Sequence, residues 1–248
     1  MDTPRYLECL RADAARLREV AAEGLAARVP TCPDWTVREL VEHVATVYLH
    51  KAETMRRDSW PDPWPPDVSA EQPLELMDRT LADLLAELES RSPGDKSLTW
   101  YEPDQTVGFW TRRMAQETVI HRVDAELAAG APLAPIPADL AVDGVDELLR
   151  CFFAYATANW PDDFGAALPA NDGRTLSVVA GDHTFHVRLA TSGAVVTASD
   201  SPAEATISGS AADVLLWLWR RPPATEPSLT GDRQLATTFH DMLQEATQ

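Results

Sequence analysis

The sequence predicts an α+β protein in which an all-helical front precedes a small mixed back. Apolar residues recur at helical spacing throughout the first part of the chain, whereas short alternating runs separated by tight turns replace them near its end. Between these parts lies a stretch rich in Pro, Gly, Asp and Ala. We therefore expect a helical domain over residues 1–160, a linker over 161–172 and an α+β domain over 173–248.

Five helices are expected in the front, each with an apolar stripe at spacings of three and four residues. They cover residues 4–27, 37–56, 73–90, 110–128 and 138–158. The second helix follows Thr36, which can form a capping box with Glu39. The segment 58–73 contains five prolines together with Trp60 and Trp64. These tryptophans require cover, so the segment is either a packed connector or a lid or pocket wall.

Period-two alternation predicts short strands in the back of the chain. The expected strands cover residues 176–180, 184–190, 194–198 and 205–209. Tight turns at Gly181-Asp182 and Ser192-Gly193 join the first three of them. Two helices, over 211–220 and 234–247, complete the domain.

Charge and composition exclude several classes of partner. The net charge of −18 at pH 7 argues against binding to nucleic acid or to anionic membranes. Neither a secretory signal nor an apolar run of transmembrane length is visible. The three cysteines, Cys9, Cys32 and Cys151, are far apart, which predicts no disulfide framework and no paired-cysteine zinc site. We expect a cytoplasmic protein that acts on small molecules, and no feature requires more than a monomer.

The helix at 110–128 carries ionisable residues on the same face as its large apolar anchors. Glu117 and His121 are one turn apart on this face, and Asp124 follows one turn later. Buried charges are costly unless they are paired or bind a metal. The face is therefore either half of a metal site or an ion-pair network in which Arg113 pairs with Glu117 and His121 with Asp124.

His43 is a third candidate ligand, at the edge of the apolar arc of the helix at 37–56. A single histidine in such a place is more often a satisfied helix-edge residue. An antiparallel bundle could nevertheless bring His43 opposite Glu117 and His121. Two imidazoles and one carboxylate are the ligand set of a catalytic zinc ion with an open position. Spacing alone does not decide between these interpretations.

Several motifs resemble one protein family. The chain reads C-P-D-W-T-V-R-E-L-V-E-H-V at 32–44 and R-R-M-A-Q-E-T-V-I-H-R-V-D-A at 112–125, with D-G-V-D-E-L-L at 143–149 and G-S-A-A-D-V-L-L-W-L-W-R-R at 209–221. Together they resemble the mycothiol-dependent maleylpyruvate isomerase family of actinobacteria, within the DinB-like metal-binding superfamily. The arginine-rich composition, with only two lysines, agrees with a high-GC genome. The resemblance implies an up-down four-helix bundle followed by an α+β domain similar to sterol-carrier folds.

The same resemblance implies a ligand set. His43, Glu117 and His121 would bind a divalent metal, usually zinc. The chain departs from its relatives at Gln116, where they often carry a histidine; by helical counting Gln116 faces away from the ligands, so the site should survive. Asp124 is expected to orient a ligand histidine, or to be a surface charge, rather than to be a fourth ligand.

The resemblance also implies a chemistry, because a metal-coordinated thiol is deprotonated. A mycothiol thiolate would add to an activated double bond and leave again in an isomerase, or remain attached in an S-transferase. An acidic substrate would require a nearby cation, for which Arg113, Arg220 and Arg221 are candidates. Arg113 could instead pair with a carboxylate, and the other two could close a helix C-terminus. The alternative functions are a non-catalytic metal- and ligand-binding protein and a structural bundle with ion-paired residues.

Overall fold

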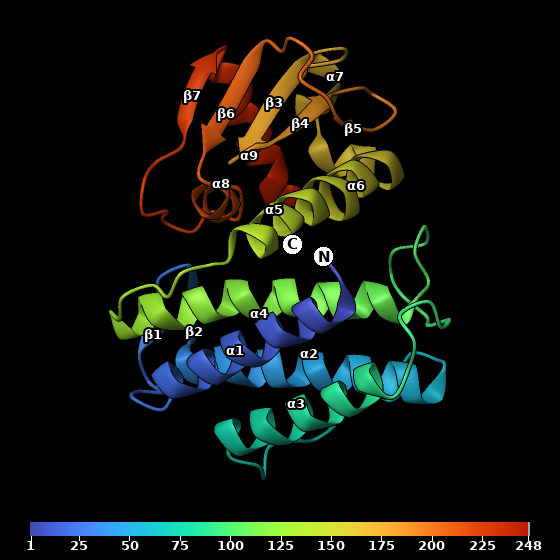
Figure 1. Ribbon diagram of the computed structural model, residues 1–248, viewed down its shortest axis with the longest axis vertical. Helices are drawn as coiled ribbons and strands as arrows, with labels where there is room; N and C mark the ends of the chain where they lie inside the picture. Colours follow the sequence, from blue (N-terminus) through green and yellow to red (C-terminus); the bar gives the residue numbers. More distant parts are fainter. Residues whose placement is uncertain (248) are drawn as a thin grey trace. The chain divides into compact units, whose positions relative to one another are not determined.

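Four long helices form the first part of the chain in the computed structural model, which describes residues 1–247 (Figure 1). Residues Met1–Ala134 make up one compact unit. Its elements are α1 Thr3–Ala21, β1 Arg28–Val29, β2 Cys32–Thr36, α2 Val37–Arg57, α3 Pro73–Glu89 and α4 Val107–Ala129. The expected helical bundle is thus confirmed, and a short antiparallel β1–β2 ribbon connects its first two helices.

Local signals determine where the key helices begin and end. The predicted capping box opens α2, because the Thr36 side chain accepts from the Glu39 backbone and the Glu39 carboxylate accepts from Thr36 N. At the start of α4 the Thr106 side chain accepts a hydrogen bond from the Phe109 backbone, and α4 ends where Gly130 adopts a left-handed φ of 62°. These caps fix which residues of α2 and α4 can face each other.

The side of α4 opposite the apolar anchors is also buried, because α1 packs along it. Arg122 Nε lies 3.0 Å from Asp13 Oδ1 on α1, and its Nη1 lies 2.7 Å from Glu126 Oε2. Arg16 reaches the other oxygen of Glu126 at 2.9 Å. α4 therefore has no continuous solvent face, and Arg122 and Glu126 on this side are held in a buried pair.

The chain from Pro135 onward forms the second unit. It begins with α5 Ala138–Glu147, a π-helical segment Leu148–Ala154 and α6 Tyr155–Asn159. The sequence analysis grouped this helix with the bundle, but its Phe153 ring packs 5.1 Å from that of Phe239 near the end of the chain. The expected linker also belongs here, as a 3₁₀ turn and a short helix, with Phe164 against Phe153. Both differences arise because the Phe153 ring packs against aromatic rings of its own unit, those of Phe164 and Phe239.

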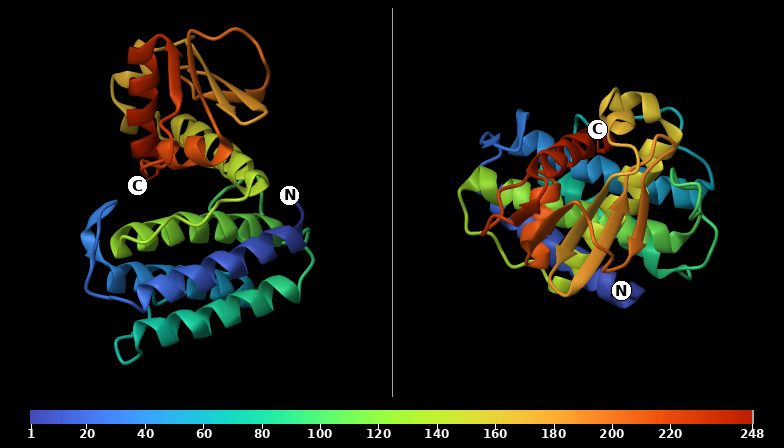
Figure 2. Two further views of the ribbon diagram at one scale, coloured as in Figure 1. Left: turned by 60° about the vertical axis from the view of Figure 1, so that its left-hand side comes forward. Right: turned by 90° about the horizontal axis from the view of Figure 1, so that it is seen from above.

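A five-stranded mixed sheet organises the second unit (Figure 2). The strand order is β5-β4-β3-β6-β7, with β3 parallel to β6 and the other pairs antiparallel. The elements are α7 Ala167–Ala170, β3 Thr175–Ala180, β4 His183–Arg188, β5 Val195–Ala198, β6 Ala205–Gly209, α8 Ala211–Leu218, β7 Ser228–Gly231 and α9 Arg233–Ala246. Helices α8 and α9 pack on the sheet, which confirms the predicted α+β domain.

The edge strand β7 was not expected from the sequence. Its four residues are mostly exposed, so it has no alternating apolar pattern.

Within residues 1–247 the helices are too short or too polar to cross a bilayer.

Candidate metal centre

Helices α2 and α4 bring three predicted ligands together. His43 projects from the second turn of α2, and Glu117 and His121 project from the middle of α4. The Nε2 atoms of both histidines lie 3.2 Å from the same oxygen, Glu117 Oε1. One donor atom from each residue lies within 4.8 Å of the others. The arrangement predicted for facing helices is therefore present, while metal binding by it stays a prediction.

Neighbouring side chains fix the orientation of these donors. Arg113 Nη2 donates to Glu117 Oε2 at 2.9 Å, so the other carboxylate oxygen faces the two imidazoles. The Nδ1 atom of His121 lies 3.0 Å from Asp124 Oδ2, and Thr31 donates to the second oxygen of Asp124. A histidine that donates its Nδ1 proton to a carboxylate keeps the Nε2 lone pair available for a metal. Asp124 thus occupies the orienting position expected for it.

The electrostatics of the metal-free site favour an ion-pair network. Burial raises the pKa of Glu117, but the His121 charge, bonds from both imidazoles and Arg113 together hold it well below its usual range. Burial likewise lowers the pKa of His121, but the charges of Glu117 and Asp124 raise it to about 9. Both interpretations from the sequence therefore describe the same residues. A bound metal would replace the proton that Glu117 and His121 share in the ion pair.

Trp35 is part of this site, although the sequence analysis assigned it no role. It lies on β2, and its ring centroid is 4.8 Å from that of His43 and 6.3 Å from that of His121. The ring thus lies beside both imidazoles of the triad. The sequence feature that could have indicated this position is the tryptophan in the C-P-D-W-T segment just before α2.

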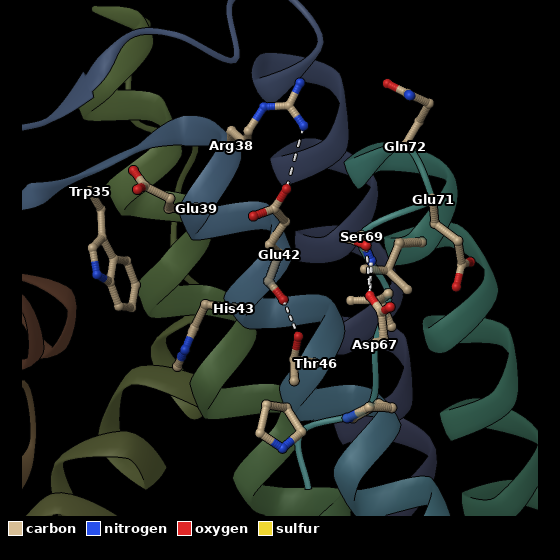
Figure 3. A pocket seen from close by; sticks show the side chains of 14 residues that line it. Trp35, Arg38, Glu39, Glu42, His43, Thr46, Asp67, Ser69, Glu71 and Gln72 are labelled. Atoms are coloured by element: carbon tan, nitrogen blue, oxygen red, sulfur yellow. Dashed lines mark hydrogen bonds and ion pairs between the residues drawn. The ribbon is translucent and has the colours of Figure 1, made fainter.

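Two pockets meet at His43. The larger is a groove of about 740 Å³ along α2, lined by Trp35, His43 and the connection before α3 (Figure 3). The smaller has a volume of about 260 Å³ and includes Trp64. Residues 65–69 border the larger groove. The connection at 58–72 is therefore a pocket wall, one of the two possibilities left open by its composition.

The remaining candidate residues lie elsewhere. Arg220 and Arg221 belong to the second unit, where Arg220 pairs with Asp241 at 2.8 Å and Arg221 donates to the carbonyl of Trp219. They close the end of α8, and a role in substrate binding stays a prediction. Gln116 is buried and lies outside the triad, and Cys32 is partly exposed and forms no disulfide.

Comparisons with known proteins agree with this architecture. Residues 7–126 match the family described as Mycothiol maleylpyruvate isomerase N-terminal domain, and residues 139–238 match the MDMPI C-terminal domain. A crystal structure of the mycothiol-dependent maleylpyruvate isomerase superposes with a TM-score of 0.60 at 17% identity, over 93% of both chains. A histidine-to-alanine mutant of that isomerase superposes with the same score at 15% identity, again over 93% of both chains. At these identities the two structures establish a shared fold. No protein among the curated sequences matches this chain.

Proposed function

Because the chain belongs to the mycothiol maleylpyruvate isomerase family, we propose that it is a zinc-dependent enzyme that uses mycothiol as a thiol cofactor or co-substrate. Its substrate would be a small acidic electrophile, and the reaction either an isomerisation or an S-transfer. One observation carries the proposal: two imidazoles and one carboxylate converge beside a groove that can admit a ligand.

The donor set fits a divalent ion. Zinc favours imidazole nitrogen and carboxylate oxygen, and three protein ligands leave a position open for a further ligand. His43, Glu117 and His121 would hold the ion. When bound, it would supply the Lewis acidity that makes a thiol nucleophilic near neutral pH.

The other residues of the site prepare these donors. Asp124 keeps the proton of His121 on Nδ1, and Arg113 restrains the second oxygen of Glu117. Trp35 packs against the imidazole of His43. Polar and charged side chains line the larger groove together with Trp35, Val68, Leu76 and two prolines, so a hydrophilic thiol would find polar partners there.

Metal content is the first test. Protein purified without an affinity-tag metal should contain about one zinc ion per chain by elemental analysis. His121→Ala should lose it, whereas the matched control His183→Ala, exposed on β4, should retain it. Equal and negligible metal in all three proteins, with unchanged thermal stability, would identify the triad as an ion-paired network.

Thiol-dependent turnover is the second test. Zinc-loaded protein should consume or isomerise an acidic electrophile only when mycothiol is present. Recovery of free mycothiol after turnover indicates an isomerase, and a mycothiol adduct indicates an S-transferase. Binding of mycothiol without turnover would reject catalysis and leave a binding protein.

A further inference from the structure

Lys51 is a partly buried cation in the second half of α2, and it has no carboxylate partner among residues 1–247. Among the described residues, its ammonium contacts only His50 Nδ1, at 3.1 Å, and the face of the Trp110 ring, at 4.8 Å from the centroid. Removing an unpaired charge from water costs free energy, so a cation in this position is a candidate for binding a ligand. The chain has only one other lysine, Lys96, which is exposed.

The neighbours of Lys51 hold the ammonium without neutralising it. An ammonium has three protons to donate, and His50 can accept only one. Burial, and next the charge of Lys51, lower the pKa of His50 to about 4, so this imidazole is neutral and its Nδ1 can accept. Burial lowers the pKa of Lys51 itself to about 8; the carboxylate of Glu117 opposes this shift and Arg113 adds to it. The amine is therefore mostly protonated at pH 7, with donors unused.

The pocket beside Lys51 has no acidic residue in its lining. The lining consists of His43, Thr46, Val47, His50, Lys51 and Trp64. This is unusual in a chain of net charge −18, and the larger groove on α2 is bordered by Glu39, Glu42, Asp67 and Glu71. The smaller pocket thus offers a positive charge and aromatic walls, and its lining adds no carboxylate to that of Glu117, whose charge also acts on Lys51.

We propose that this pocket of about 260 Å³ is a carboxylate-binding site, in which Lys51 pairs with the carboxylate of a small acidic substrate. Because His43 lines the same pocket, a carboxylate held by Lys51 places the rest of the molecule next to the metal ligands. Lys51 is then a specificity-determining residue, and His50 positions its ammonium. The role in substrate selection rests on the proposed function, but anion binding by the pocket does not.

Nuclear magnetic resonance can test anion binding directly. Protein labelled with ¹³C at the lysine ε-carbons gives two lysine signals, which Lys96→Met assigns. Acetate should shift the Lys51 signal and raise the midpoint of its pH titration, because a bound carboxylate stabilises the charged amine. Acetamide, of the same size but neutral, should leave it in place, and Lys96 should respond to neither. A Lys51 signal that ignores acetate, or that moves no more than Lys96, overturns the site.

Kinetics test the role in substrate selection. With zinc and mycothiol, Lys51→Met should raise KM about tenfold or more for an electrophile that bears a carboxylate. KM for the corresponding neutral amide should stay within about twofold of the wild-type value. Lys96→Met is the matched control, and melting temperatures verify folding. An equal loss for both substrates, or no loss for the acid, overturns this role. If the wild-type protein shows no turnover, the proposed function is rejected. The acetate titration then still tests whether the pocket binds a carboxylate.

Discussion

Replacing Asp124 by asparagine should weaken zinc binding while preserving the fold. The Asp124 side chain is fully buried, and its Oδ2 lies 3.0 Å from Nδ1 of His121, whose side chain is 11% exposed. Water therefore screens this interaction little. Asparagine keeps the shape and can still accept a hydrogen bond, but it removes the charge that strengthens the imidazole as a ligand.

Loss of such an orienting carboxylate typically lowers metal affinity about 10- to 100-fold. This corresponds to about 1.4–2.7 kcal/mol of binding free energy. The control is Thr31→Val, which removes the hydroxyl that donates to Asp124 Oδ1 but leaves the charge in place. We expect the control to change zinc affinity by less than about tenfold, because a single hydrogen bond contributes about 1 kcal/mol.

Competition with a chromophoric chelator at constant pH measures both affinities. Melting curves in EDTA establish that each variant folds without metal. A folded Asp124→Asn protein that binds zinc as tightly as the wild type would refute the orienting role. A Thr31→Val protein with the larger loss would indicate that the ribbon, rather than the charge, supports the site.

Three further predictions concern stability. Arg122→Met should lower the free energy of unfolding by about 3–5 kcal/mol, because it leaves the fully buried Glu126 with one cation fewer. Urea denaturation measures this loss, and a value below about 1 kcal/mol would contradict the prediction. The Tyr48 hydroxyl lies 2.6 Å from Thr118 Oγ1, which itself donates to a backbone carbonyl. Tyr48→Phe should therefore cost about 1 kcal/mol, and Thr118→Val about 1–3 kcal/mol because it strands a buried hydroxyl; the reverse order would contradict the assignment. Lys51→Met should be more stable than wild type at pH 7, and the difference should shrink as pH rises from about 8 toward the usual lysine pKa of about 10.4. The difference shrinks because the folded state releases the Lys51 proton at a lower pH than the unfolded state does, which stabilises the wild type as pH rises. A constant difference in melting temperature between the two proteins across that range would disprove this.

The sequence carried the information for the helices of the bundle and for the donor chemistry. Helical periodicity and the Thr36–Glu39 capping box located α2 to within about one residue. The spacing of Glu117 and His121 placed both on one face of α4, because a helix repeats every 3.6 residues. These features are local, so they can be recognised without knowledge of the fold.

The sequence was less informative where packing between distant segments decides the outcome. The helix at 138–158 has an apolar face, but nothing in its sequence states which partner that face meets; Phe239, far along the chain, is one of them. Strand β7 forms because β6 offers it an edge, not because its own residues alternate. The burial of Arg122 likewise depends on Asp13, 109 residues away.

The same distinction between local sequence features and packing applies to the candidate site. By themselves, the residues offered two imidazoles and a carboxylate on helices able to face each other, and they left open a metal site or an ion-pair network. Only the tertiary structure decided that one oxygen of Glu117 meets both histidines, that Trp35 packs beside them and that Lys51 lines an adjacent pocket without an ion-pair partner. The physical reason is that ligand chemistry and helical spacing belong to the covalent chain, whereas distance, burial and the missing counter-ion arise only when separate elements pack.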